Sequence, residues 1–561
     1  MAQRGALRTI VRGAATRAVP EGTDMPPQPD EQTDYIIVGA GSAGCVLAHR
    51  LSERADTAVC LIEAGGENRS PLIDTPMGLP LLLRGRRHNW YLETEAQGEL
   101  RGRRLYWPRG KVLGGSSSIN AMIYMRGHPG DYDDWAAAGN PGWGWSDVLP
   151  RFLRHEHAPG GDPVHHGSSG PLHVSDLRSP NPLSLDFLRA AEACGLPRRD
   201  DFHDGQDLQG CGLYKVTQWQ GRRWSAANAF VDPVRHRGNL QLRTGCRVTR
   251  VLFDGRRAVG VELLGPRGRQ RLRARAEVLL CAGAVHSPQL LLLSGIGDAA
   301  ALRALGIDVV LDVPGVGRDL QDHLDVTASM REHLHASVGV GPRMLPRLLA
   351  QAWRYAGHRD GLLSSNAAEA GGFARSRPGL ARPDLQLHFL PSLLRDHGRR
   401  LVWGYGVTLH ACALRPASRG TISLRSPDPL APPRIDPAYL SHPDDLPVLR
   451  EGLRLARRVL GSPAWGRHAG VEVSPGPGVG DDDDALDAYI RDNAETIYHP
   501  VGSCRMGRDA LAVVDSRLRV RGVDALRVVD ASIMPTLVGG NTNAPSMMIG
   551  EMAADFLLGR A

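Results

Sequence analysis

The 561-residue sequence has few lysines, few aromatic residues and no long apolar run. Lys111 and Lys215 are the only lysines, and we attribute the preference for arginine to the coding genome rather than to function. Aromatic residues make up 5% of the chain, and none alternate with basic residues as they do in a nucleic-acid groove. No apolar run approaches the roughly 18 residues that span a bilayer. We therefore expect no membrane-spanning segment and no nucleic-acid partner, despite a net charge of +7.

The cysteines and histidines lack the spacings that mark redox or metal motifs. The eight cysteines are dispersed and form no C-x-x-C pair, so we expect reduced thiols in a cytoplasmic protein. Four histidines between residues 155 and 166 repeat no ligand spacing and lie in a turn-rich stretch. We therefore predict no metal site.

Residues 1–33 do not resemble part of a folded domain. Arg4, Arg8 and Arg12 recur at helical spacing, as in a targeting segment or a basic amphipathic anchor. The alternative, which we favour, is a disordered extension, with translation starting at Met25.

The segment Asp34–Glu63 has the pattern of a strand, a glycine-rich turn, a helix and a second strand. Gly39, Gly41 and Gly44 stand in the G-x-G-x-x-G spacing. The first permits a tight turn, the second lets a pyrophosphate approach the backbone, and the third allows close packing of helix on strand. Glu63 ends the second strand, where a carboxylate accepts both ribose hydroxyls of an adenosine. The segment predicts a dinucleotide site, and the carboxylate disfavours a 2′-phosphate and so NADP.

Two later segments have the composition of ligand-contacting loops. Residues 109–127 combine Gly114, Gly115 and three serines with an apolar run, which suggests a cofactor lying against the core. Near the C-terminus, a strand over 526–530 ends in an acid that could bind ribose or ribityl hydroxyls. The run 539–545 then opens a helix over 546–558, whose N–H groups favour an anionic group.

Elsewhere the pattern predicts a sheet and an amphipathic helix. Residues 240–275 alternate as a meander, and the strand over 278–281 with the helix over 287–294 would return the chain to a parallel sheet. Residues 344–355 have apolar positions at helical spacing between arginines. We expect this helix to pack on a core, with a membrane-surface role as the alternative. We likewise expect the apolar cluster at 79–83 to pack under a neighbour, with a place at a substrate entrance as the alternative.

Several segments in order resemble those of the glucose–methanol–choline (GMC) oxidoreductases, flavoenzymes that oxidise alcohols. The resemblance begins near Asp34 and extends to the C-terminus. Within the family the chain is most similar to the acceptor-dependent aliphatic alcohol dehydrogenases, followed by the choline dehydrogenases; residues 221–227 and 365–373 carry this finer placement. The main segments are G-A-G-S-A-G with Glu63, G-K-V-L-G-G-S-S-S-I-N at 110–120, G-A-V-H-S-P at 283–288, S-G-I-G at 294–297, H-P-V-G-S-C-R-M-G at 499–507 and N-T-N at 541–543.

The resemblance implies that the dinucleotide is FAD. Some relatives attach FAD through a histidine that matches position 119, where this chain has Ile119, so we predict non-covalent FAD. The implied cofactor residues are Gly39, Gly41, Gly44 and Glu63 at the ADP half, Val248 near the adenine, Gly114, Gly115, Ser117, Asn120 and Met122 near the pyrophosphate and isoalloxazine, and Asp530 and Ala531 near the ribityl chain.

The resemblance also assigns the chemistry. His499 matches the catalytic histidine, the base that takes the hydroxyl proton while a hydride passes to flavin N5. Asn543 is assigned as the partner that hydrogen-bonds the substrate oxygen. Glu369 stands where an acid could bind choline, and could equally be structural. We favour primary aliphatic alcohols as substrates, with choline as the alternative.

The resemblance implies an α/β architecture with two domains. A Rossmann-like FAD-binding domain with a parallel sheet would comprise residues 34–164, 226–321 and 505–561. A substrate-binding domain, built on an antiparallel sheet and helices, would comprise 165–225 and 322–504. The expected electron acceptor is a quinone, with oxygen as the alternative, and the expected location is the cytoplasm with possible peripheral contact with the inner membrane. A cyanohydrin lyase and a non-catalytic flavoprotein are readings outside this class. The oligomeric state is not predicted.

Overall fold

The computed structural model describes residues 31–205, 207–400 and 402–560. The proposed targeting or anchoring role of residues 1–24 lies outside these ranges. The first strand begins at Glu31, so residues 31–33, expected to be part of the extension, belong to the fold. Their place is set by parallel pairing with Leu272–Ala274.

The first large sheet is mixed, with its strands in the order β10-β2-β1-β13-β12-β11. The long strand β13 pairs with β12 in antiparallel fashion through its first half and with β24 in parallel through its last residues. The last strand of the predicted meander (269–275) and the predicted parallel strand (278–281) are therefore parts of one strand, and β10, expected in the meander, instead pairs in parallel with β2. The strands are β1 (Glu31–Val38), β2 (Val59–Ile62), β10 (Leu240–Arg243), β11 (Arg247–Asp254), β12 (Arg257–Gly265), β13 (Gly268–Leu280) and β24 (Leu526–Val528).

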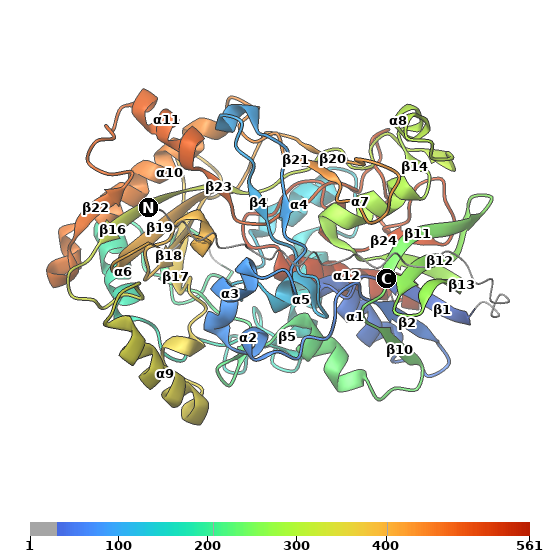
Figure 1. The fold of residues 1–561 in the computed structure, drawn as a ribbon, viewed down its shortest axis with the longest axis horizontal. Helices are drawn as coiled ribbons and strands as arrows, with labels where there is room; N and C mark the ends of the chain where they lie inside the picture. The colour runs from blue at the N-terminus through green and yellow to red at the C-terminus, as the bar shows by residue number, and fades with distance from the viewer. Residues whose placement is uncertain (1–30, 206, 401, 561) are drawn as a thin grey trace, which may run out of the picture.

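The second large sheet is antiparallel, in the order β22-β16-β19-β18-β17-β7, with β23 paired to β16. It lies at the opposite end of the molecule from the first sheet (Figure 1). The predicted α/β fold with an antiparallel second sheet is confirmed, whereas the domain boundaries remain a prediction. The strands are β7 (Gly210–Leu213), β16 (Leu324–Arg331), β17 (Ala370–Ala374), β18 (Leu385–Leu390), β19 (Gly406–Ala413), β22 (Val471–Ser474) and β23 (Glu495–Thr496).

Short two-stranded pairings connect the remaining segments. They are β3 (Leu92–Glu93) with β4 (Tyr106–Trp107), β5 (Glu156–His157) with β6 (Leu172–His173), β8 (Gln218–Trp219) with β9 (Arg222–Arg223), β14 (Ile296–Gly297) with β15 (Leu311–Asp312), and β20 (Thr421–Ser423) with β21 (Arg434–Asp436).

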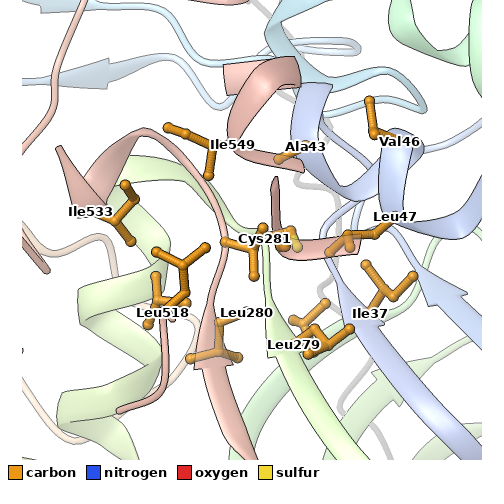
Figure 2. Close-up of a cluster of buried hydrophobic side chains, with 14 of the residues drawn as sticks. Ile37, Ala43, Val46, Leu47, Leu279, Leu280, Cys281, Leu518, Ile533 and Ile549 are labelled. Atoms are coloured by element: carbon orange, nitrogen blue, oxygen red, sulfur yellow. The ribbon is translucent and has the colours of Figure 1, made fainter. Parts of the chain in front are cut away.

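Each sheet is covered by helices that bury its apolar face. Against the first sheet, α1 packs beside α12, an apolar helix buried along most of its length. Figure 2 shows Ile37, Leu47, Leu279 and Ile549 meeting in this core. The helices are α1 (Ser42–Leu51), α2 (Pro71–Asp74), α3 (Leu79–Arg84), α4 (Pro129–Ala137), α5 (Trp145–His155), α6 (Pro182–Ala193), α7 (Gly283–Leu293), α8 (Ala299–Ala304), α9 (Met344–His358), α10 (Asp445–Leu460), α11 (Asp483–Asn493) and α12 (Asn543–Leu558).

One expectation about helix packing is wrong. Helix α9 was expected to bury its apolar face, but Leu345 and Leu349 are each 65% exposed and Trp353 is 85% exposed. The cluster 79–83 does pack under its neighbours through the buried Leu82, while Leu79 and Leu83 line a cavity, so both interpretations of this cluster have support. Every helix in the described ranges is too short or too polar to traverse a bilayer.

Candidate active site

A cavity of about 450 Å³ lies where the turn after β1 meets the start of α1. Gly39, with φ +103°, makes this turn, and a Cβ there would stand 2.5 Å from the carbonyl oxygen of Cys281. A Cβ on Gly44 would stand 2.0 Å from the carbonyl oxygen of Gly39, so only glycine allows this approach of helix and strand. Gly39, Gly41 and Ser42 line the cavity, and within the described ranges no side chain caps α1. The first N–H groups of α1 are therefore available to an anion.

Glu63 lines the same cavity at the end of β2. Its carboxylate accepts hydrogen bonds from the N–H of Ala40 (3.1 Å) and of Gly65 (2.7 Å). Burial raises the pKa of Glu63 to about 7. Each carboxylate oxygen has a second lone pair, so the group can still accept hydroxyl donors from a ligand.

The loop after Gly110 forms a second wall. Gly115 and Asn120 line the cavity, and so does Met122, which has φ +59°. Gly114 and Ser117 do not line the cavity. The Ser117 hydroxyl donates to the Gly114 carbonyl (2.6 Å) and accepts from the backbone N–H of Ala226 (2.9 Å), so these two residues hold the loop in shape.

Asp530 follows β24 and lines the cavity with Ala531; Val248 lines it from β11. The Asp530 carboxylate accepts from the N–H of Gly283 (2.8 Å) and from the Ser287 hydroxyl (2.5 Å). Burial raises the pKa of Asp530. The acid therefore ties the start of α7 to the strand that carries it.

The His499 backbone is fixed by Asp322. The His499 N–H donates to the Asp322 carboxylate (2.7 Å), which also accepts from the hydroxyls of Tyr439 and Thr496. Burial raises the pKa of Asp322 to about 6. The peptide of His499 is thus held by a buried carboxylate, and its ring is free to be oriented by other groups.

The His499 ring lies between His323 and Asn541. Its Nδ1 is 3.0 Å from Nδ1 of His323, and its Nε2 is 3.3 Å from Nδ2 of Asn541. His323 Nε2 is 3.1 Å from the carbonyl oxygen of Leu414, which only accepts, so the proton of His323 is on Nε2. His323 Nδ1 is then an acceptor, and His499 must carry its proton on Nδ1.

The amide of Asn541 supports the same tautomer of His499. Its oxygen accepts from Nε2 of Gln386 (3.2 Å), which leaves the amide nitrogen as donor to His499. Both contacts therefore place the proton of His499 on Nδ1 and its lone pair on Nε2, where it accepts from the Asn541 amide. Burial, reinforced by His323, His388 and Arg109, lowers the pKa of His499 well below 6.5, so the imidazole is neutral at neutral pH. A neutral imidazole with its lone pair in a buried cavity is able to act as a general base.

Comparison with known proteins identifies the family. Two GMC oxidoreductase family models match residues 33–325 and 416–550. The chain belongs to the GMC oxidoreductase family. It is 49% identical to "Alcohol dehydrogenase [acceptor]" of Pseudomonas putida, over 94% of this chain and 95% of that protein. It is 43% identical to "Choline dehydrogenase, mitochondrial" of Mus musculus, over 98% and 94% of the two chains. A crystal structure of pyridoxine 4-oxidase from Mesorbium loti superposes with a TM-score of 0.84 at 34% identity, covering 93% and 98% of the chains.

Membership of the GMC oxidoreductases implies FAD, and the residues of this cavity fit that group. The uncapped start of α1 suits a pyrophosphate, and the buried carboxylates of Glu63 and Asp530 suit the hydroxyls of a ribose and a ribityl chain. Within the described ranges, no group of three or more histidine, cysteine or acidic side chains could hold a metal ion.

In this GMC oxidoreductase both asparagines of the N-T-N run line the cavity, and the role assigned to Asn543 at the substrate oxygen stays a prediction. Asn543 begins α12, and its side-chain oxygen accepts from the Ser42 hydroxyl (2.7 Å) at the start of α1, which leaves its amide nitrogen as a donor. Asn541 takes the position beside His499. Both asparagines lie in the same G-G-N-T-N run, and nothing in the sequence says which one faces the histidine.

Glu369 does not lie at the cavity, where an acid that binds substrate would be expected. It is 1% exposed and does not line the cavity. Its carboxylate accepts from the hydroxyls of Ser184 (2.7 Å) and Ser365 (2.5 Å) and from the N–H of Asn181 (2.6 Å). Glu369 therefore joins the start of α6 to the segment before β17.

Several residues around the base were not predicted. His323 and Asn541 orient the ring, Arg109 and His388 line the cavity, and Gln386 orients Asn541. The sequence has no motif that marks His323, which directly precedes β16 and is brought to His499 only by the fold.

Proposed function

We propose that this GMC oxidoreductase oxidises primary aliphatic alcohols to aldehydes with FAD, with His499 as the base, and passes the electrons to a quinone-type acceptor. The observation that carries the proposal is the neutral His499, which lines the same cavity as the proposed cofactor-binding residues and has its Nε2 as a hydrogen-bond acceptor. The similarity to an acceptor-dependent alcohol dehydrogenase supports it.

In the proposed mechanism, His499 Nε2 takes the hydroxyl proton of the alcohol. The alcohol hydroxyl takes the place of the Asn541 amide at this nitrogen, and the amide nitrogen of Asn543, whose side-chain oxygen is held by Ser42, donates to the alcohol oxygen. FAD, when bound, supplies the acceptor for the hydride that leaves the carbinol carbon. The alcohol thus loses one proton and one hydride and becomes the aldehyde. Burial of the site excludes water and keeps the base neutral before each turnover.

The cavity wall supports an uncharged, apolar substrate. Leu79, Leu83, Val338, Leu390 and Leu394 line it. Among the described residues, its only acids are Glu63 and Asp530, which the cofactor would occupy. A quaternary ammonium group requires a carboxylate or an aromatic cage. Glu369 does not line the cavity, and of the lining residues Trp90 and Tyr498, the Trp90 ring already faces the cations of Lys111 and Arg247, which would repel a third cation. This favours aliphatic alcohols over choline, which remains the alternative because of the choline dehydrogenase relatives.

We propose that the FAD is bound without a covalent link. Ile119 lines the cavity at the position where some relatives carry the linking histidine, and its side chain has no nucleophilic atom. Acid precipitation should release the flavin to the supernatant. A yellow pellet would contradict this part of the proposal.

The decisive experiment is anaerobic bleaching of the purified flavoprotein by 1-octanol, benzyl alcohol and choline. We expect 1-octanol to bleach the flavin fastest, and His499→Ala to retain flavin absorbance while slowing bleaching ~100-fold or more. Absence of bleaching by every alcohol would favour the lyase reading, and equal rates in the variant would reject His499 as the base. Reoxidation of the reduced enzyme by oxygen or by a short-chain quinone separates an oxidase from a quinone-linked dehydrogenase.

A further inference from the structure

Helix α9 has its apolar side turned to solvent. Leu345, Leu348, Leu349 and Trp353 form one stripe at helical spacing and are 65%, 38%, 65% and 85% exposed. The helix stands at the edge of the molecule (Figure 1). In a helix that serves only to cover a core, this stripe would face inward.

The inward side of α9 is held by polar contacts instead. Arg347 donates to the carbonyls of residues 335–337, at 3.0–3.1 Å. The Gln351 side chain accepts from the N–H of Leu362 (2.8 Å), and the Tyr355 hydroxyl donates to the Gly221 carbonyl (3.0 Å). The orientation of the helix is thus fixed by specific bonds, and exposure of the stripe is a property of the folded protein.

The apolar surface continues beyond the helix. Leu334 is 51% exposed and Trp403 is 66% exposed. They belong to two segments that pair through reciprocal hydrogen bonds between Val340 and Gly404 (3.0 and 2.9 Å). Arg347 ties the first of these segments to α9. We define the α9 surface as Leu334, Leu345, Leu348, Leu349, Trp353 and Trp403.

The charges around this surface are basic. Arg343, Arg347, Arg354 and Arg359 lie on or beside α9. No acidic residue occurs between positions 333 and 359, and Asp360, the next residue, pairs with Arg354, which leaves an excess of positive charge. Contact between two copies of the chain through this face would bring the same arginines together, because a two-fold interface joins identical patches. Anionic lipid headgroups match them. Apolar residues with tryptophan on one side and arginine alongside are typical of helices that lie in a membrane interface.

We propose that the α9 surface binds peripherally to a bilayer containing anionic lipid, with the leucine stripe and Trp353 in the headgroup region. The proposal does not depend on the identity of the substrate. The surface also adjoins the cavity: Val338, between Leu334 and α9, lines the cavity wall and donates its N–H to Pro391 (2.7 Å). The bound enzyme would therefore have this wall of its cavity close to the membrane.

The test is flotation of the full-length holoenzyme with vesicles of phosphatidylcholine, alone or mixed with phosphatidylglycerol. The variant is Leu349→Gln with Trp353→Gln. The matched control is Val164→Gln with Leu511→Gln, which changes exposed apolar side chains (63% and 38%) on other segments. Flavin content and thermal midpoint verify that each variant is folded, and flavin reduction by a short-chain alcohol should be unchanged in all of them.

We expect the parent and the control to float with the anionic vesicles and the α9 variant to bind at least tenfold more weakly. High salt should weaken the binding of the parent, since screening acts on the arginines. The proposal is overturned if the α9 variant floats as well as the parent, or if the parent does not float. It is also overturned if the parent is a dimer that the α9 variant dissociates, because the surface would then be occupied by a second copy.

Discussion

The geometry around His499 predicts that His323 selects the tautomer of the base. With His323 in place, the proton of His499 is held on Nδ1 by a bond of 3.0 Å. His323→Leu removes the acceptor and leaves a buried donor unsatisfied, which costs about 1–3 kcal/mol. In the alcohol complex, where the hydroxyl replaces the Asn541 amide at Nε2, the imidazole escapes this cost by moving its proton to Nε2, and that nitrogen can then no longer accept the proton of the alcohol.

A bias of about 2 kcal/mol toward the unproductive tautomer corresponds to a roughly 30-fold slower reaction, since 1.36 kcal/mol is tenfold in rate. We therefore expect His323→Leu to slow anaerobic flavin reduction at saturating 1-octanol by about 10- to 100-fold, with little change in the alcohol concentration for half-maximal rate. His323→Gln is the matched control. Its side-chain oxygen can accept from His499 while its amide donates to the Leu414 carbonyl, so we expect a rate within about threefold of the parent.

Stopped-flow reduction of the three proteins, with flavin absorbance and thermal midpoint as folding controls, measures this difference. If the leucine and glutamine variants are equally slow, His323 acts only by filling space. If the leucine variant is as fast as the parent, the tautomer is set by another group, and the reasoning from the Leu414 carbonyl is wrong.

The remaining predictions concern pH and the asparagines. Because the pKa of His499 is lowered well below 6.5, flavin reduction should be independent of pH from mildly alkaline values down to 6.5; a midpoint at or above 6.5 would contradict a buried neutral base. Asn543→Ala should slow flavin reduction by at least tenfold, because the alcohol oxygen loses its proposed donor, whereas Asn541→Ala removes only a contact that orients the His499 ring and should have a smaller effect; the reverse order would assign the substrate contact to Asn541. Hydrogen bonds to Asp201, then to Glu156, raise the pKa of His166 to about 9, so its stabilising contribution is complete below 6.5 and is lost as pH rises through about 9. Thermal midpoints should fall over this range in the parent and less steeply in His166→Gln.

The part of the site proposed to bind the cofactor was predictable because the residues that shape it lie close together in the chain. The turn at Gly39 and the packing at Gly44 require glycine for reasons that are local, and Glu63 follows the next strand at a fixed distance. The strand–turn–helix pattern therefore predicts the arrangement. Val248 and Asp530, far away in sequence, were placed by the family resemblance, and the structure brings both to the same cavity.

The residues that orient the base were not predictable in this way. Asn541 and Asn543 differ by two positions, and the backbone at the start of α12 turns one toward His499 and the other toward Ser42. Glu369 was a candidate for substrate binding because the sequence alone does not distinguish a buried structural acid from an acid that binds a ligand. Helix α9 was assigned to a core because its apolar spacing is that of core helices, and spacing does not reveal which face a protein turns inward.

Three consecutive residues, 321–323, connect the base to both halves of the molecule. Gln321 pairs with Val501 and binds the backbone of residues 535 and 537, beside the cofactor segment. Asp322 holds the peptide of His499, and His323 orients its ring just before strand β16 of the second sheet begins. Because residues 322 and 323 hold both the peptide and the ring of His499, a shift of the second sheet relative to the first would displace the whole His499 side chain and leave its tautomer unchanged. The position of His499 relative to the proposed cofactor-binding residues is therefore set by the segment that joins the two sheets rather than by either sheet alone.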